Sequence, residues 1–438
     1  MVYYIVYCII FMVRGGIMNN LRRFIMYQIL FALLFIVTSF LSACSSESNP
    51  AGDSGLTDIS QGEPDSGNED AGVEDIGTFQ SRLTRYPYIT YRGNNSFTLF
   101  WETDHDETGY IRLDDKLYKV PPTKLSIKVG ADLKTRTIYQ YSAKFDMLPE
   151  DRKITYEILS LKTPLKSSFS SRSTNNDFVF AVYGDNRSGA PYLDENPTHK
   201  EVTSLIAKYE PEFVINTGDI VYAGGLEGEW YQFFNDGATL FRKAALFVAI
   251  GNHESGGYDI FNRQFDFPNG EKFYYSFDWG NSHFIVLCLD CGISPENEQY
   301  KWLKEDIETA DSNPDVKHLF VSFHEPPYTF STHAPNMDAR NYIVPLLKTT
   351  RTRLVVNGHN HTYEHIFKDS IHYLVSGGGG APLYPEKEIK YEEGETPYMV
   401  KYQMVFNFSI VHVSNNSINV KTFDNNNQLI EEFNITEE

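Results

Sequence analysis

Five short apolar runs in this 438-residue chain each end in a polar segment that contains residues able to bind metal ions. The candidate ligands in these segments begin with Asp185, Asp219, Asn252, His324 and His359. Carboxylate, amide and imidazole groups are common protein ligands of divalent and trivalent metals. One Gly-Asp pair would be ordinary turn chemistry, but five such endings in order indicate a shared site. The pattern therefore predicts metal-dependent chemistry.

These endings lie where strand-like apolar runs alternate with amphipathic, helix-like segments. Expected strands cover 178–183, 213–216, 245–250, 283–289, 319–323, 354–356 and 371–375, and expected helices cover 198–209, with Thr198 as N-cap, and 296–309. Such alternation indicates an α/β domain with buried sheets, which we place at residues 175–436. Ligands of open α/β sheets gather at the carboxyl ends of strands, and the five polar segments stand at those ends.

The segment before this domain has an all-β pattern. Residues 96–101 alternate in period two, and further short strands are expected at 138–145 and 154–159. We expect a small β-sandwich over residues 84–165. Its opening, Pro87-Tyr88-Ile89 with Trp101, resembles a fibronectin type III-like domain, and we assign no chemistry to it.

The first 44 residues are expected to be a targeting signal and not part of a folded domain. Arg22 and Arg23 precede an apolar run over 24–40, and Leu41-Ser42-Ala43-Cys44 follows. This order resembles a bacterial lipoprotein signal with its lipobox, so residues 1–44 would be a signal peptide and Cys44 the lipid-anchored residue. An ordinary transmembrane anchor is the alternative. We expect a location at the bacterial cell envelope, in the outer membrane, facing the periplasm or at the cell surface.

The charge of the chain is negative and partly concentrated in one segment. The formal net charge is −20 at pH 7, which argues against nucleic-acid binding through a basic face. Nine of the acidic residues lie between Ser45 and Gln80, where Lys and Arg are absent. Such a polar segment cannot bury enough apolar surface to offset its ordering entropy. Residues 45–83 are therefore expected to form a disordered acidic tether.

Cys288 and Cys291 form a C-x-x-C sequence at the end of an apolar run. In an oxidising envelope the two could form a disulfide, and two unpaired strand-end thiols are the alternative. A separate metal site is disfavoured, because two more ligands would be needed nearby.

The five polar segments resemble the motifs of the calcineurin-like metallophosphoesterase superfamily, and in detail those of its purple acid phosphatases. The wider superfamily has Asp-x-His in the first segment. Here that His position is Arg187, which cannot ligate because guanidinium stays protonated. Purple acid phosphatases supply a Tyr three residues after the second Asp, and Tyr222 stands there. The resemblance runs from about Pro87 to Phe433 and implies a sandwich of two mixed β-sheets flanked by helices, preceded by the small β-sandwich.

This resemblance implies two metal ions. Carried over by position, the first ion would be held by Asp185, Tyr222 and His361, the second by Asn252, His324 and His359, and both by the bridging Asp219. The family implies Fe(III) at the first position and Zn(II), Mn(II) or Fe(II) at the second. Hard carboxylate and phenolate donors suit a trivalent ion. A packed aromatic without a ligand role is the alternative for Tyr222.

Three further residues receive catalytic roles from the resemblance. His253 would face the phosphate group, and His333 aligns with a loop histidine that protonates the leaving group. The family often has a second His directly after that histidine, whereas Ala334 follows here. Arg187 would bind a phosphate oxygen or would only pair with a surface acid. His365 stands where the family commonly has Arg.

We therefore expect a dinuclear metal-dependent hydrolase of phosphate monoesters, of the acid phosphatase type, active under mildly acidic conditions. The alternative enzyme is a phosphodiesterase or nucleotidase that uses the same dimetal centre. The alternative from another class is a non-catalytic surface binding protein that uses the β-sandwich for adhesion. The expected partners are a phosphate ester and the membrane lipid, and the sequence does not fix the oligomeric state.

Overall fold

The computed structural model describes residues 57–58, 78–128, 134–191, 195–268, 273–392 and 394–436. These residues belong to one compact unit. The expected signal peptide with Cys44, and most of the expected tether, lie outside them. Within the tether range, Thr57–Asp58 pair with a strand of the N-terminal region. None of the helices in the described part of the chain is both long and apolar enough to span a membrane.

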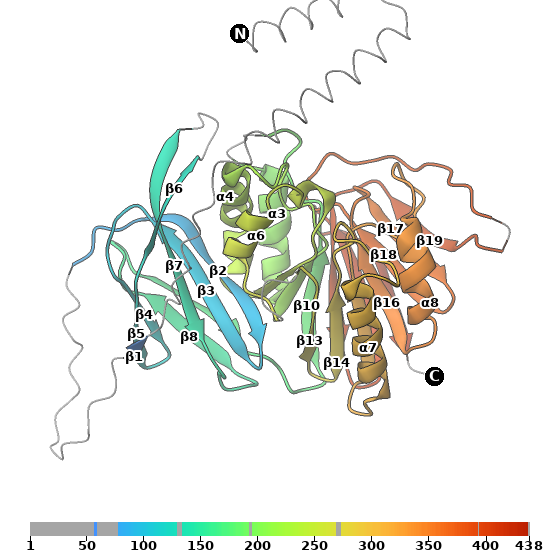
Figure 1. The fold of residues 1–438 in the computed structure, drawn as a ribbon, viewed down its shortest axis with the longest axis horizontal. Coiled ribbons are helices and arrows are strands. Elements are labelled where there is room, and N and C mark those ends of the chain that lie inside the picture. The colour runs from blue at the N-terminus through green and yellow to red at the C-terminus, as the bar shows by residue number, and fades with distance from the viewer. Residues whose placement is uncertain are drawn as a thin grey trace, which may run out of the picture. The chain divides into compact units, whose positions relative to one another are not determined.

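The largest sheet of the described chain has ten strands in the order β22-β21-β20-β10-β11-β12-β2-β3-β7-β6 (Figure 1). Its strands are β2 (Leu83–Gly93), β3 (Ser96–Thr103), β6 (Thr123–Lys128), β7 (Thr135–Phe145), β10 (Phe178–Tyr183), β11 (Phe213–Asn216), β12 (Ala245–Val248), β20 (Asn407–Val413), β21 (Ser417–Asp424) and β22 (Leu429–Thr436). Strands β10, β11, β12 and β2 run parallel, and the other pairs are antiparallel.

The second large sheet has seven strands in the order β13-β14-β15-β16-β18-β17-β19. They are β13 (Tyr275–Trp279), β14 (Ser282–Val286), β15 (His318–Ser322), β16 (Thr352–Asn357), β17 (Tyr363–Lys368), β18 (Ile371–Ser376) and β19 (Tyr398–Gln403). A third sheet, in the order β1-β5-β4-β8-β9, is made of β1 (Thr57–Asp58), β4 (Gly109–Leu113), β5 (Lys116–Val120), β8 (Lys153–Ile158) and β9 (Leu165–Ser170).

Short helices flank the two large sheets (Figure 1). They are α3 (Pro197–Ile206), η1 (Ala207–Tyr209), α4 (Glu227–Asp236), α5 (Ala238–Phe241), η2 (Asn252–Glu254), α6 (Tyr258–Gln264), α7 (Glu298–Ser312), the π-helical turn η3 (Ala339–Ile343) and α8 (Val344–Leu347). Helix α7 buries Leu303 and Ile307 in one apolar cluster with Ile285 of β14. The predicted fold class is confirmed, with two large mixed sheets and few helices.

Aromatic side chains between the two large sheets form the centre of the core. Phe180 and Phe213 of one sheet contact Phe284 of the other with ring centroids 5.3 and 5.2 Å apart. All four residues of β11 and of β12 are buried, as expected for parallel strands covered on both faces. This packing holds the sheets together and aligns the ends of their strands.

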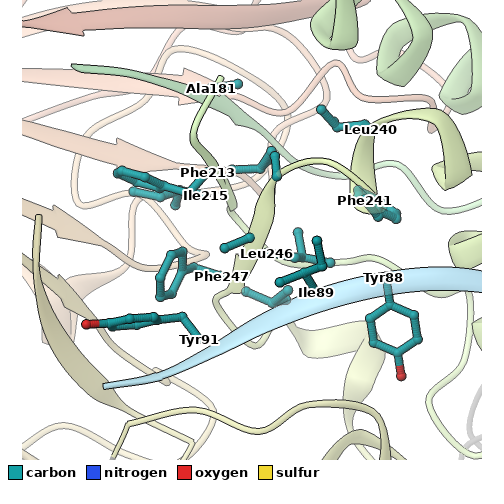
Figure 2. Close-up of a cluster of buried hydrophobic side chains, with 14 of the residues drawn as sticks. Tyr88, Ile89, Tyr91, Ala181, Phe213, Ile215, Leu240, Phe241, Leu246 and Phe247 are labelled. Carbon is teal, nitrogen blue, oxygen red and sulfur yellow. The ribbon is translucent and has the colours of Figure 1, made fainter. Parts of the chain in front are cut away.

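The N-terminal β-strands and the α/β region share one sheet and one core. Strand β2 pairs in parallel with β12, with Ile89 opposite Ala245. Figure 2 shows Ile89 among Leu246, Phe247 and other apolar side chains from both regions. At the same junction Tyr88 stacks on Phe234 of α4, with ring centroids 3.9 Å apart. The β-sandwich and the α/β domain were expected to meet near residues 166–174. The sheet is continuous between the two regions, so this boundary separates them only in the sequence.

The structure corrects the predicted N-cap of α3 and decides between the two alternatives for Cys288 and Cys291. The predicted N-cap Thr198 is wrong: Asn196 caps α3, and its side chain accepts hydrogen bonds from the backbone N–H groups of Thr198 and His199. The helix begins earlier because Pro197, whose φ is already helical, occupies its first position. Cys288 and Cys291 are joined by a disulfide, so the unpaired-thiol alternative does not hold.

Candidate metal centre

The five polar segments meet at one edge of the paired sheets. Strands β10, β11 and β12 are parallel neighbours, and so are β15 and β16, so each group places its carboxyl ends together. The candidate ligands that follow these ends are Asp185, Asp219, Asn252, His324, His359 and His361. Segments far apart in sequence thus bring their side chains to one place, as the sequence pattern predicts.

Three of the candidate ligands have strained backbone conformations. Asp185, Asp219 and His359 have φ angles of 53°, 53° and 69°, in the left-handed region that non-glycine residues rarely adopt. Each such residue costs on the order of 1 kcal/mol or more, and such residues gather at functional sites. Gly218, with φ 99°, packs so closely that a Cβ would lie 2.9 Å from the backbone nitrogen of Gly251. The chain therefore tolerates strain in order to turn these side chains inward.

The potential ligand atoms lie within a few ångströms of one another. Among the described residues, the ligand atoms of Asp185, Asp219 and His324 all lie within 4.8 Å of one another. The Nε2 atom of His324 is 3.3 Å from Oδ1 of Asp219, and Nε2 of His361 is 3.6 Å from Oδ1 of Asp185. The ring of His359 lies 5.1 Å from that of His324. His359 Nδ1 lies 3.1 Å from the side-chain oxygen of Asn252, which brings in the sixth ligand.

The hydrogen bonds of two histidines fit a metal site. His324 Nδ1 is 2.8 Å from the carbonyl oxygen of Thr217, and His361 Nδ1 is 2.6 Å from that of Pro382. A carbonyl only accepts, so each Nδ1 donates its hydrogen there, and each Nε2, the atom that would bind a metal ion, faces the opposite side. The buried Nε2 of His324 has no hydrogen-bond partner. Ligation by a metal ion would satisfy this atom, so the residues fit the group that the fold implies.

The electrostatics of the site favour a positive charge between the carboxylates. Burial alone would lower the pKa of His324, but the carboxylates of Asp219 and Asp185 outweigh it and raise that pKa to about 10. Burial lowers the pKa of His361 to about 3. In the metal-free protein the site thus holds a proton on His324, and metal binding would release it.

Arg187 and His253 lie beside Asp219, and the Tyr222 ring lies next to both of them. The guanidinium carbon of Arg187 lies 5.4 Å from the ring centroid of Tyr222, and its Nε lies 3.8 Å from Asp219 Oδ2. The Arg187 side chain is only 10% exposed, and the acid that it faces here is the buried Asp219. Nδ1 of His253 is hydrogen bonded to the backbone carbonyl of Tyr222, and its Nε2 lies 3.8 Å from Asp219 Oδ2.

His333 lies beside the candidate ligand His359. Its ring centroid is 4.3 Å from that of His359 and 5.2 Å from that of Tyr384. Tyr384 in turn stacks on His361, with centroids 4.0 Å apart and planes 12° from parallel. Burial lowers the pKa of the half-buried His333. The sequence analysis did not single out Tyr384, because no motif marks it.

The sequence of this chain is similar to those of known phosphoesterases, in agreement with the arrangement of the candidate ligands. Residues 178–363 match the family model described as calcineurin-like phosphoesterase. The chain carries a calcineurin-like phosphoesterase domain. The Arabidopsis thaliana protein named purple acid phosphatase 15 is 30% identical over 172 residues, which cover 34% of this chain and 32% of that protein. An Arabidopsis thaliana protein named probable inactive purple acid phosphatase 9 is 26% identical over 247 residues, covering 45% and 38%.

The fold has a relative of known structure. A purple acid phosphatase isolated from yellow lupin (Lupinus luteus) seeds superposes with a TM-score of 0.65 at 18% identity, covering 80% of this chain and 74% of that one. The phosphoesterase domain and the preceding β-strands thus share the fold of that protein. The chain spans between 32% and 51% of the length of the first curated relatives that it matches.

A buried carboxylate that the sequence analysis did not single out holds two of the ligand segments of the phosphoesterase domain together. Glu254 Oε2 accepts hydrogen bonds from the backbone N–H groups of Gly251 at 2.8 Å and Asp219 at 3.0 Å. Its Oε1 accepts from those of Ile220 at 2.9 Å and Val221 at 3.2 Å. The only signal in the sequence was its place directly after two candidate site residues, and only the structure shows what it contacts.

Proposed function

We propose that this protein is a metal-dependent phosphoesterase of the purple acid phosphatase type, with phosphate monoesters as substrates. The observation that carries the proposal is the convergence of six candidate ligands from five segments on one carboxylate-rich point, where Asp185, Asp219, His324 and His361 are buried. Arg187 in place of a ligating His, with Tyr222 beside it, supports the purple acid phosphatase type over the wider superfamily.

We assign the metal-binding residues as the resemblance implies them. One ion, Fe(III) in this proposal, is held by Asp185, Tyr222 and His361, a second, Zn(II), Mn(II) or Fe(II), by Asn252, His324 and His359, and both by Asp219. When bound, the metal ions supply positive charge to the phosphate oxygens and acidify water.

The other polar side chains act on the substrate. Arg187 is held against the Tyr222 ring and donates two parallel N–H groups to phosphate oxygens. His253 has its Nδ1 fixed by a backbone carbonyl, so its Nε2, when protonated, donates to the phosphate group. His333, whose ring lies beside that of His359, donates a proton to the leaving oxygen.

The test is turnover of a chromogenic monoester, 4-nitrophenyl phosphate, by protein purified without chelator and analysed for metal. The proposal expects turnover that is abolished by chelator and is higher than that of the matching diester, bis(4-nitrophenyl) phosphate. An Asp219→Ala variant is the control for contaminating phosphatases. Absence of monoester turnover in metal-loaded protein would refute the proposal.

A phosphodiesterase activity at the same centre is the second candidate. A Hordeum vulgare protein named nucleotide pyrophosphatase/phosphodiesterase is 24% identical over 214 residues, covering 39% of this chain and 58% of that protein. Faster turnover of the diester than of the monoester would favour this candidate. A non-catalytic binding role, the third possibility, is disfavoured because every ligand position carries a side chain able to bind metal.

We also propose that Cys44 attaches the protein to a bacterial membrane by a lipid. The basic pair, the apolar run and the small residues before Cys44 support this location. The Cys288–Cys291 disulfide agrees with an oxidising compartment. A Cys44→Ser variant should lose fatty-acid labelling and membrane retention. Unchanged retention with an intact N-terminus would indicate a transmembrane anchor instead.

A further inference from the structure

The loop that carries His333 has no regular secondary structure between β15 and η3, yet its backbone is held at defined points. The side-chain oxygen of Asn360 accepts a hydrogen bond from the N–H of His333 at 2.9 Å, and its amide nitrogen donates to the His333 carbonyl at 3.3 Å. Asn360 is fully buried and lies between the candidate ligands His359 and His361. The backbone of His333 is thus paired with a side chain of the metal-site segment.

A second buried side chain extends this link. The Oγ1 atom of Thr329 accepts from the amide nitrogen of Asn360 at 2.8 Å and from the N–H of Ser331 at 3.2 Å. A hydroxyl oxygen has two lone pairs and one hydrogen, so its accepting capacity is filled. Its hydrogen goes to Oε1 of Glu364, 2.7 Å away. The direction of each hydrogen bond in the chain is therefore fixed.

Glu364 is the end of this network. Its side chain is fully buried on β17, three residues after His361. The second oxygen, Oε2, accepts from the N–H of Phe330 at 2.6 Å. Burial raises the pKa of Glu364 to about 7, yet a proton on either oxygen would face the filled hydroxyl of Thr329 or the N–H of Phe330. The network therefore requires the ionised form, in which both oxygens accept hydrogen bonds from the loop.

We propose that Glu364 is a positioning residue that, through Thr329 and Asn360, sets the place of the His333 imidazole beside the metal centre. The proposal rests on the proposed function, because a correct position of His333 matters only if it donates a proton to the leaving oxygen. A displacement of about 1 Å in a catalytic group can cost on the order of 100-fold in rate. Glu364 therefore affects the proton-transfer step without touching the substrate.

The structure shows why glutamine cannot replace Glu364. An amide NH₂ turned toward Thr329 would meet a hydroxyl oxygen whose lone pairs are both occupied. Turned the other way, it would face the N–H of Phe330, so that two donors oppose each other. Either orientation breaks one link of the network, although Gln has nearly the same shape as Glu.

The dependence on the leaving group separates positioning from general damage to the fold. A nitrophenolate leaves with little help from an acid, whereas an alkoxide needs a proton, so loss of His333 function penalises alkyl esters more. We would measure kcat/KM with 4-nitrophenyl phosphate and with glycerol 2-phosphate for the metal-loaded wild type, Glu364→Gln, His333→Ala and the double variant. Glu212→Gln is the matched control, because Glu212 accepts a hydrogen bond from Trp279 directly before β11, at the strand end opposite the site.

We expect Glu364→Gln to lower kcat/KM for glycerol 2-phosphate at least about 10-fold more than for 4-nitrophenyl phosphate. The double variant should be no worse than His333→Ala, because both changes remove the same function. Thr329→Val, which removes the same link without touching a charge, should show the same selective loss. It provides the measurement if Glu364→Gln does not fold.

Two outcomes would overturn the proposal while leaving the proposed function intact: an equal loss for both esters, or a loss that adds to that of His333→Ala. Inactivity of the wild type toward both esters would instead refute the proposed function, and the role of Glu364 with it.

Discussion

Protonated His283 should make the folded state more stable in mild acid than in mild alkali. Its Nδ1 lies 2.7 Å from Oδ1 of Asp278 on β13, and its Nε2 lies 2.9 Å from Oδ2 of Asp306 on α7. Burial alone would lower the pKa of His283, but these two carboxylates outweigh it and raise the pKa from 6.5 to about 9. The imidazolium thus links a strand pair to the helix that covers it.

The sign and size of the effect follow from this pKa. Because the folded pKa lies above the unfolded one, the stabilisation is fully present below pH 6.5 and is lost as the pH rises toward 9. The difference corresponds to at most about 3 kcal/mol, since one pH unit is worth about 1.4 kcal/mol. Asp278 is 57% exposed, so solvent screens its share, and a value between about 1 and 3 kcal/mol is expected.

The assay is denaturant unfolding at pH 6, 7.5 and 9 for the wild type and His283→Gln, both free of metal. The difference between the two proteins cancels the titration of the site histidines, which both share. Wild type should lose its advantage over His283→Gln as the pH rises. His412→Gln is the control, because His412 pairs with Asp177 on the surface, where an ion pair contributes little. A constant difference between wild type and His283→Gln from pH 6 to 9 would refute the reasoning.

Three further predictions concern the metal centre. Asp219→Ala should lose metal content and several orders of magnitude in turnover, measured by elemental analysis and initial rates; a variant that keeps both would disprove the bridging role. Tyr222→Phe should remove the visible absorption band of the iron-loaded protein without unfolding it; colourless wild type with a full complement of iron would exclude a phenolate ligand. Glu254→Gln should leave backbone N–H groups unpaired and so lower the unfolding free energy by about 1–3 kcal/mol. The variant should also lose metal faster on dialysis. Unchanged metal retention would contradict the role of Glu254 in holding the ligand segments.

The elements that carry the site were predictable from the amino-acid pattern. The expected strands at 178–183 and 213–216 have the same bounds as β10 and β11, because strands buried on both faces read as continuous apolar runs. Parallel strands share one carboxyl edge, so the approach of Asp185 to Asp219 followed from the order of the elements alone. The replacement of a ligating His by Arg187 and the gain of Tyr222 were also readable from the motifs, but the contact between the two side chains was not predicted.

The residues that hold these side chains in place were not predictable, because they act through long-range contacts. Glu254 and Glu364 look like ordinary acidic residues in the sequence, yet each is buried and accepts hydrogen bonds from segments more than thirty residues away. Tyr384, which stacks on His361, lies in the long loop between β18 and β19, where the sequence has no periodic pattern. The pairing of β2 with β12 joins residues 156 positions apart, Ile89 and Ala245. Local patterns report on propensity and burial, but such long-range partners are selected only when the sheets pack, because their contacts are formed by groups that are distant along the chain.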